Sequence, residues 1–173
     1  MADTSRLYHY VLALGSNRAL SARLTPARLL DAATAAIEAE AGRLIARAPA
    51  LSSAPLGPSR RRYVNSALLI ESPLRPDALL RRLQAIETRL GRRRHRRWGE
   101  RTLDIDIILW SGGRWSERRL TIPHAAWRVR PFVLTPVAHI APLWRDPVTR
   151  LTARHLLVRL TRGRVVDQRP AAL

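Results

Sequence analysis

Cysteine is absent from the 173-residue sequence, so disulfides, zinc–thiolate sites and thiol nucleophiles are excluded. Lysine is absent as well, and the chain therefore has no Walker A loop for binding nucleotides. The glycine patterns G-x-G-x-x-G and G-x-S-x-G are also missing. No apolar run reaches the roughly 18 residues that a transmembrane helix needs, and the first seven residues do not resemble a secretion signal. We therefore expect a cytoplasmic protein.

Arginine supplies every basic side chain apart from histidine and gives the chain a formal net charge of +18. This charge favours an anionic partner, either nucleic acid or a nucleoside triphosphate. Because coding bias also enriches arginine, its positions are more informative than its number. The length and the 46% content of hydrophobic residues predict one domain over residues 1–173 with a proper core.

The expected order of elements is β-α-β-β-α-β. Runs of β-forming residues predict strands at 8–14, within 44–53, at 63–71 and at 102–110. Helical spacing of apolar residues predicts a helix near 26–42 and a second from Pro76 to a stop at Gly91. This order is typical of an α+β, ferredoxin-like antiparallel sheet with helices on one face. A C-terminal extension follows, with a helix at 151–160 and a short strand at 165–166.

The most informative segment is R-T-L-D-I-D-I at residues 101–107. Side chains alternate along a strand, so Asp104 and Asp106 are expected on the same face, with α-carbons about 6–7 Å apart. Two like charges on one face repel each other, and a hard cation such as Mg²⁺ between them removes that cost. The alternative is a solvated strand whose aspartates pair with arginines. The basic segment 92–101 precedes the strand, and cations beside a metal site suit a polyphosphate.

Four blocks of the sequence resemble the 6-hydroxymethyl-7,8-dihydropterin pyrophosphokinase family. They are L-A-L-G-S-N at 12–17, Y-V-N-S-A at 63–67, I-E at 86–87 through R-T-L-D-I-D at 101–106, and L-T-I-P-H at 120–124 through F-V-L at 132–134. The last thirty residues match poorly. Glu100, Ala125 and Pro131 depart from the family pattern, but none of these departures removes the aspartate pair.

The resemblance implies transfer of diphosphate from ATP to the hydroxymethyl group of 6-hydroxymethyl-7,8-dihydropterin, in folate biosynthesis. It implies two Mg²⁺ ions that bind with ATP on Asp104 and Asp106. ATP and the pterin are then the expected partners of a monomer that binds neither nucleic acid nor membrane.

The resemblance also implies roles for individual residues. Arg92 and Arg101 join the two aspartates as catalytic residues that contact phosphates. The expected pterin contacts are Ser53, Ala54, Pro55, Leu56, Tyr63, Asn65, Trp98 and Phe132, with Tyr63 and Phe132 on either side of the ring and Trp98 closing over it. The expected ATP contacts are Gln84, Glu87, Arg94, Arg97, Ile107, Arg119, Leu120, Thr121, His124 and Arg130. Residues 92–101 are expected to form a lid.

Two alternatives stay open at this point. One is a basic ferredoxin-like module that binds RNA without catalysis, although Tyr63 and its neighbours lack the glycine-and-aromatic strand motif of such modules. The other is a protein that binds pterin or ATP only. For Phe132 taken alone, packing in the core is the commoner role, and for His124 taken alone the commoner role is a structural histidine with satisfied hydrogen bonds.

Overall fold

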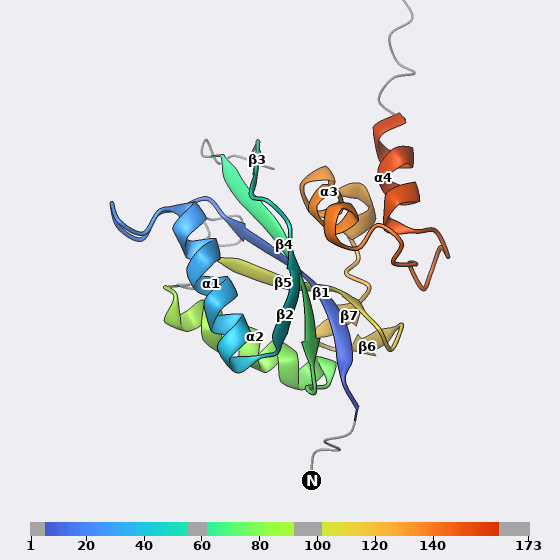
Figure 1. Cartoon of the computed structure of the whole chain (residues 1–173), viewed down its shortest axis with the longest axis horizontal. Helices are drawn as coiled ribbons and strands as arrows, with labels where there is room; N and C mark the ends of the chain where they lie inside the picture. Colours follow the sequence, from blue (N-terminus) through green and yellow to red (C-terminus); the bar gives the residue numbers. More distant parts are fainter. Residues whose placement is uncertain (1–5, 55–61, 92–101, 163–173) are drawn as a thin grey trace, which may run out of the picture.

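A five-stranded antiparallel sheet forms the centre of the molecule (Figure 1). The structure is a computed structural model that describes residues 6–54, 62–91 and 102–162. The strands follow the order β2-β4-β1-β5, and β3 also pairs with β4. Their bounds are β1 Tyr8–Ser16, β2 Arg43–Arg47, β3 Leu51–Ser53, β4 Tyr63–Ser72 and β5 Asp104–Trp110. Because β4 separates β1 from β2, and β1 separates β4 from β5, the sheet has the split arrangement that the sequence predicted.

Two helices cover one face of the sheet: α1 (Pro26–Glu40) and α2 (Pro76–Arg89). Both begin at a proline, whose missing N–H is not needed in the first turn, and the Thr25 side chain accepts a hydrogen bond from the Arg28 N–H at the start of α1. Gly91, with φ of 89°, follows the end of α2 in a conformation that favours glycine.

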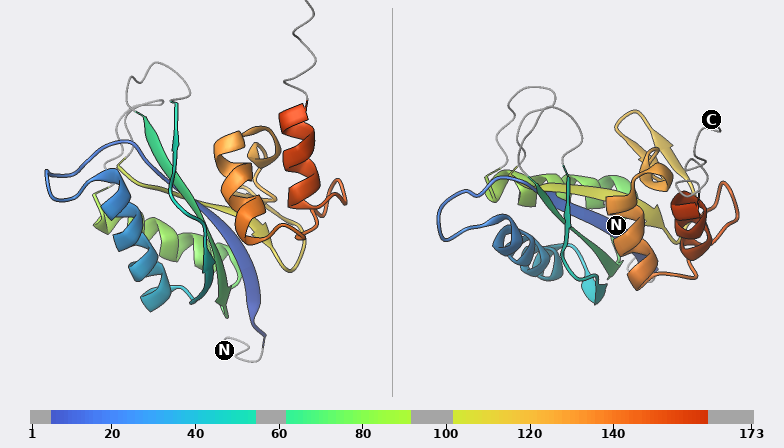
Figure 2. Two further views of the ribbon diagram at one scale, coloured as in Figure 1. Left: turned by 45° about the horizontal axis from the view of Figure 1, so that its top comes forward. Right: turned by 90° about the horizontal axis from the view of Figure 1, so that it is seen from above.

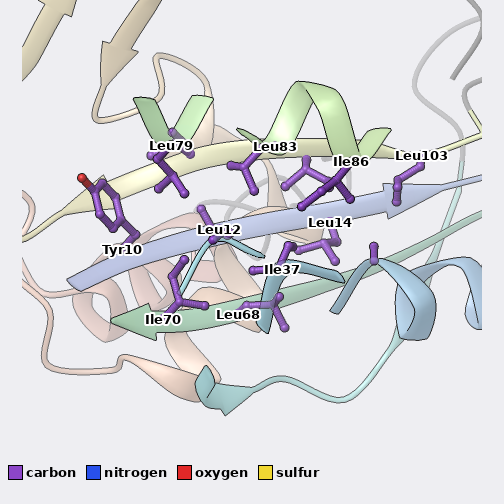
Figure 3. Packing of buried hydrophobic residues seen from close by; sticks show 14 of the residues in the cluster. Tyr10, Leu12, Leu14, Ile37, Leu68, Ile70, Leu79, Leu83, Ile86 and Leu103 are labelled. Atoms are coloured by element: carbon purple, nitrogen blue, oxygen red, sulfur yellow. The ribbon is translucent and has the colours of Figure 1, made fainter. Parts of the chain in front are cut away.

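The main core lies between these helices and the sheet (Figure 3). Every second residue of β1, namely Tyr10, Leu12 and Leu14, points into it and is at most 2% exposed. Leu83 and Ile86 of α2 meet them from the helix side, both completely buried. Burial of this apolar surface is the main stabilising term for the sheet and its two helices.

Helices also cover the opposite face, which corrects the expectation of helices on one face only (Figure 2). The short 3-10 helix η1 (Trp127–Val129) leads into α3 (Pro131–Ile140), and α4 (Ala153–Arg162) packs against both. Trp127 is completely buried in the second core, together with Val133, Leu134 and Val137 of α3. None of the helices in the described ranges is long and apolar enough to cross a membrane.

Several elements differ from the sequence expectations. The predicted second strand is divided into β2 and β3, with Pro49 in the interval. The hairpin of β6 (Trp115–Glu117) and β7 (Leu120–Ile122) was not predicted, because strands of three residues carry little periodicity. Helix α3 was missed because it contains Pro131 and Pro136, although Pro131 is at its start and only Pro136 is internal. The strand expected at 165–166 lies outside the described residues.

The main core gives a prediction of stability. Leu83→Ala should lower the free energy of unfolding by about 2–5 kcal/mol, because it leaves a cavity between α2 and the sheet. Leu143→Ala is the matched control, since this leucine is 77% exposed and its loss should change stability by no more than about 0.5 kcal/mol. Urea unfolding measures both, and equal stability of the two variants would contradict the assigned core.

Candidate functional site

The two aspartates of β5 lie on the face that α3 covers. Ile105 and Ile107 belong to the core under α1 and α2, whereas Ile108 belongs to the core under α3. Asp106 pairs with Ala13, which packs against the core under α3, and Asp104 pairs with Gly15 two residues further along the same face. Both are half-buried. The sequence prediction that they point to the same side is confirmed.

A polar row crosses the sheet at this end. Gly15 of β1 lies directly between Asn65 of β4 and Asp104 of β5 in the strand register, and Ala13 lies next to Asp106. A Cβ atom added to Gly15 would come within 3.3 Å of the Asn65 Oδ1 atom. Small residues on β1 therefore put nothing larger than a methyl group between the asparagine amide and the two carboxylates.

Asn65 is held in place from the neighbouring strand. Its Nδ2 donates a hydrogen bond of 2.8 Å to the Ser53 Oγ atom, and its side chain is only 6% exposed. Ser53 pairs with Tyr63 across β3 and β4, and Tyr63 shares the face of Asn65 by alternation. Ser53, Tyr63 and Asn65, three of the predicted pterin contacts, thus lie together, and exposed Ala54 follows directly.

Helix α3 brings further predicted residues to this face. Arg130 is its N-cap and Phe132 is in its first turn, and the helix packs against β4, β1 and β3. Phe132 is half-buried against the core beneath α3. The structure therefore places the only phenylalanine of the chain on a helix that packs against β4, the strand that carries Tyr63 and Asn65.

His124 follows β7 and is attached to β5. Its backbone N–H donates a hydrogen bond of 3.1 Å to the carbonyl of Ile108, two residues beyond Asp106. Its Nδ1 accepts a hydrogen bond of 3.3 Å from the Ala126 N–H, which leaves Nε2 as the protonated nitrogen of the neutral ring. The half-buried imidazole therefore has a donor available at Nε2.

The start of β5 is positioned by two buried groups from other elements. Ser16 is the last residue of β1, and its hydroxyl donates a hydrogen bond to the backbone carbonyl of Thr102. On the other face, the Glu87 carboxylate of α2 accepts a hydrogen bond of 2.7 Å from the N–H of Ile105, the residue between the two aspartates. These contacts set the position and direction of the strand segment that carries the carboxylates.

The donor set fits a magnesium ion. Two carboxylates on one strand face offer hard oxygen ligands, and Gly15 and Ala13 beside them leave room for further ligands. Among residues 6–54, 62–91 and 102–162 no group of three or more histidine, aspartate or glutamate side chains gathers to form a complete protein cage. Mg²⁺ usually completes its shell with water and substrate phosphates, which matches a pair of carboxylates.

Two predicted ATP contacts have side chains that are buried away from the aspartates, and their contacts with ATP stay predictions. The Ile107 side chain is 2% exposed in the main core, because its position in β5 turns it towards α1 and α2. Glu87 is 1% exposed and supports the β5 backbone, as described above. Their side chains are therefore buried on the face opposite the aspartates. Leu120 is half-buried, with its side chain packed against the main core.

The other predicted ATP residues are accessible. Gln84 is exposed on α2, Arg119 is exposed in the turn of the β6–β7 hairpin, and Thr121 is exposed on β7. Strand β7 lies against β5 and α2, so the hairpin borders the strand of the aspartates. ATP contacts by these three residues stay predictions.

Seven of the predicted residues lie outside the described ranges: Pro55, Leu56, Arg92, Arg94, Arg97, Trp98 and Arg101. The proposed lid over 92–101 lies there too.

Sequence reasoning missed three residues that shape this region. Gly15 belongs to the first matching block but had no assigned role. The feature that marks it is a glycine within a strand, next to the strands that carry Asn65 and Asp104. Arg128 and Asp146 are 18 positions apart, on either side of α3, and no periodicity connects them. The one local signal for Asp146 is the sequence D-P-V-T at 146–149, which is typical of a turn that begins with an aspartate.

A family comparison agrees with this geometry. A model of 7,8-dihydro-6-hydroxymethylpterin-pyrophosphokinase (HPPK) matches residues 11–142. Proteins named 2-amino-4-hydroxy-6-hydroxymethyldihydropteridine pyrophosphokinase are similar in sequence. The Pseudomonas aeruginosa protein is 42% identical over 84% of this chain and 85% of its own length. The Haemophilus influenzae protein is 44% identical over 75% of this chain and 79% of its own length.

Other similar proteins are longer than the matched region. The Synechocystis relative is 43% identical, and the match spans 61% of this chain and about half, 54%, of that protein. Among solved structures, wild-type Plasmodium falciparum HPPK-DHPS superposes with a TM-score of 0.73 over 94% of this chain and 46% of its own. At 13% identity that likeness shows the fold alone.

The buried Glu87 contact gives a second prediction. Glu87→Ala should leave the Ile105 N–H without its acceptor, which should lower the free energy of unfolding by about 1–3 kcal/mol. Hydrogen exchange at the Ile105 amide should accelerate, whereas Glu87→Gln keeps an acceptor oxygen and most of the protection. Glu117→Ala on exposed β6 is the control. Unchanged Ile105 protection in Glu87→Ala would mean that the carboxylate does not support β5.

Proposed function

Because the chain belongs to the 7,8-dihydro-6-hydroxymethylpterin-pyrophosphokinase family, we propose that it transfers a diphosphate group from ATP to 6-hydroxymethyl-7,8-dihydropterin in folate biosynthesis. The observation that carries the proposal is the row of Asn65, Gly15 and Asp104 across three strands. In this row the Asn65 amide, the proposed pterin contact, lies one strand away from the Asp104 carboxylate, the proposed metal ligand.

Asp104 and Asp106 are the proposed ligands of two Mg²⁺ ions that arrive with ATP. When bound, Mg²⁺ neutralises phosphate charge and aligns the attacking and leaving oxygens. The carboxylates keep their shared direction because Ser16 and Glu87 hold the strand from either side. Exposed Arg119 and half-buried Arg130 add positive charge for the phosphates of ATP, and His124 offers an Nε2 donor.

The pterin is proposed to bind at Asn65, between Tyr63 and Phe132. The Asn65 amide has an acceptor oxygen and one N–H beyond the bond to Ser53, which suits the alternating donors and acceptors of a pterin edge. A flat heterocycle between two aromatic rings gains both apolar burial and stacking. Half-buried Tyr63 and Phe132 reach this place from β4 and α3.

In the proposed reaction, the hydroxymethyl oxygen of the pterin forms a bond to the β-phosphorus of ATP and loses its proton. The bond from that phosphorus to the oxygen bridging the α- and β-phosphates breaks, and AMP leaves. The residues contribute positioning and charge stabilisation, which can supply much of the catalysis in phosphoryl transfer. The proposed enzyme is a cytoplasmic monomer that acts on these two small molecules.

The metal site gives the central prediction. Asp104→Asn and Asp106→Asn should each reduce pterin-dependent AMP release by at least about a thousandfold, because each removes one anionic ligand of the metal–ATP complex. The measurement is AMP formed from ATP with the pterin present or absent, at several magnesium concentrations. Asp31→Asn is the matched control, since this aspartate is exposed on α1 and pairs with Arg47.

Two results would contradict the proposal. One is full activity in either β5 variant, with the fold intact by circular dichroism. The other is a wild-type protein that releases ADP, or no pterin-dependent AMP, while it binds RNA tightly without magnesium. The second result would favour the nucleic-acid module that the arginine content also allows.

The pterin site gives a separate prediction. Phe132→Ala should raise the KM for the pterin by about 5- to 150-fold, the range expected when one ring that stacks on a heterocycle is lost. The KM for ATP should stay within about twofold, and Phe132→Tyr should keep most of the affinity because it keeps a ring. Equal increases in both KM values would show that Phe132 supports the fold and not the pterin.

A further inference from the structure

An ion pair joins the segment beyond the family match to the short helix that precedes the proposed pterin residue Phe132. The match ends at residue 142, and Asp146 follows in the connection from α3 to α4. Asp146 is completely buried. Both of its oxygens accept hydrogen bonds from the Arg128 guanidinium in η1, each 2.7 Å long, in the two-pronged arrangement that is the strongest form of such a pair.

Asp146 also organises its own turn. Its carboxylate accepts hydrogen bonds from the backbone N–H of Val148 and from the N–H and hydroxyl of Thr149. The backbone N–H of Asp146 donates a hydrogen bond of 2.8 Å to the carbonyl of Leu151. The backbone carbonyl of Asp146 accepts one of 2.9 Å from the N–H of Arg150. The turn therefore presents the carboxylate to Arg128 in one position.

The carboxylate is ionised at neutral pH. Burial acts to raise its pKa, but the hydrogen bonds from Arg128, Thr149 and the Val148 backbone outweigh burial and lower the pKa to about 2. A carboxylate whose pKa is lowered by folding stabilises the folded state at pH values above its pKa in the unfolded chain. This contribution is lost as the pH falls from about 4 to about 2. The pair is therefore intact throughout the physiological range.

Arg128 connects this pair to the start of α3. Its guanidinium lies 5.7 Å from the ring centre of Trp127, which is completely buried in the core beneath α3. Two residues later, Arg130 accepts the first backbone hydrogen bonds of α3, from Val133 and Leu134. No side chain caps this end of the helix, and η1 packs directly against it.

We propose that Asp146 is a positioning residue for the pterin site: through Arg128 it holds η1, and η1 holds the end of α3 that carries Arg130 and Phe132. This inference rests on the proposed function, because it takes Phe132 as a pterin contact. It gives the C-terminal segment a role in substrate binding, although that segment lies outside the matched family region.

The pair acts mainly on the pterin side, because among the predicted ATP contacts in the described residues only Arg130 shares this end of α3. Asp104 and Asp106 are positioned by Ser16 and Glu87, which belong to β1 and α2. His124 has its own backbone bond to the Ile108 carbonyl on β5. Loss of the Asp146–Arg128 pair therefore loosens the cover over the pterin and leaves the metal–ATP side attached to the sheet.

Asp146→Asn tests the proposal with steady-state kinetics on the full chain. It should raise the KM for the pterin by about tenfold, equivalent to about 1.4 kcal/mol, with kcat and the KM for ATP within about twofold. Arg128→Lys should give the same selective change, because lysine cannot make the two-pronged contact. Asp31→Asn is the control, since it removes an aspartate whose side chain is 61% exposed and paired with Arg47.

A purely structural role gives a different result and overturns the proposal. In that case Asp146→Asn lowers the melting temperature but leaves the pterin KM of the folded protein unchanged. If Asp146→Asn does not fold, Thr149→Val is the milder variant, since it removes one hydroxyl donor and keeps the ion pair. It should still raise the pterin KM by about threefold, about half of the free energy of the tenfold effect, and an unchanged KM would overturn the proposal.

Failure of this inference is distinguishable from failure of the proposed function. Pterin-dependent AMP release by the wild type tests the function. With that activity present, pterin binding to wild type and Asp146→Asn in the presence of magnesium and a non-hydrolysable ATP analogue tests the inference alone. Weaker pterin binding in the variant, with equal binding of the analogue, supports the positioning role. Equal pterin binding overturns it.

Discussion

The alternation of side chains along β5 is the constraint on which the rest of the structure depends. Leu103, Ile105 and Ile107 point into the main core, so Asp104 and Asp106 are forced onto the other face. Burial of the three apolar side chains therefore also determines where the two carboxylates point. A slip of one residue in the pairing with β1 would reverse both at once, which is why the strand register and the site cannot change independently.

The two faces of the sheet have different tasks. The face under α1 and α2 is a continuous apolar core that stabilises the sheet. The face under α3 is apolar beneath the helix, around Val11 and Ile108, and polar at one end, around Asn65 and Asp104. A site at the border of a rigid core takes its geometry from that core while it stays accessible to ligands. Small residues on β1, between the polar strands, keep this border open.

The ion pairs of the molecule are of two kinds, exposed and buried. Surface arginines pair with acidic partners on the main helices and outer strands, as in Arg43 with Glu71 and Arg47 with Asp31, and such exposed pairs contribute little to stability. The buried pair of Arg128 with Asp146 differs, because removal of one partner leaves an uncompensated charge in the interior. The remaining excess of arginine gives the molecule a positive field that attracts an anionic substrate such as ATP.

The local sequence was sufficient for the elements and for the residues that share a strand. Apolar periodicity, first-turn prolines and Gly91 predicted α1, α2 and the four main strands, and alternation alone predicted the shared face of Asp104 and Asp106. Short or proline-containing elements such as β7 and α3 were missed, because their stability comes from packing and not from a local pattern. Alternation also predicts that Ile107 points away from the aspartates' face, whereas no local pattern indicated that Glu87 of α2 bonds to the β5 backbone.

The sequence by itself determined the ferredoxin-like order, the carboxylate pair and the family, since each is written in contiguous residues. Only the tertiary structure decided that Asn65, Gly15 and Asp104 form one row, that α3 covers the second face, and that Asp146 reaches Arg128. These contacts join residues that are far apart along the chain. Their proximity depends on strand register and on packing between layers, which no local spacing encodes.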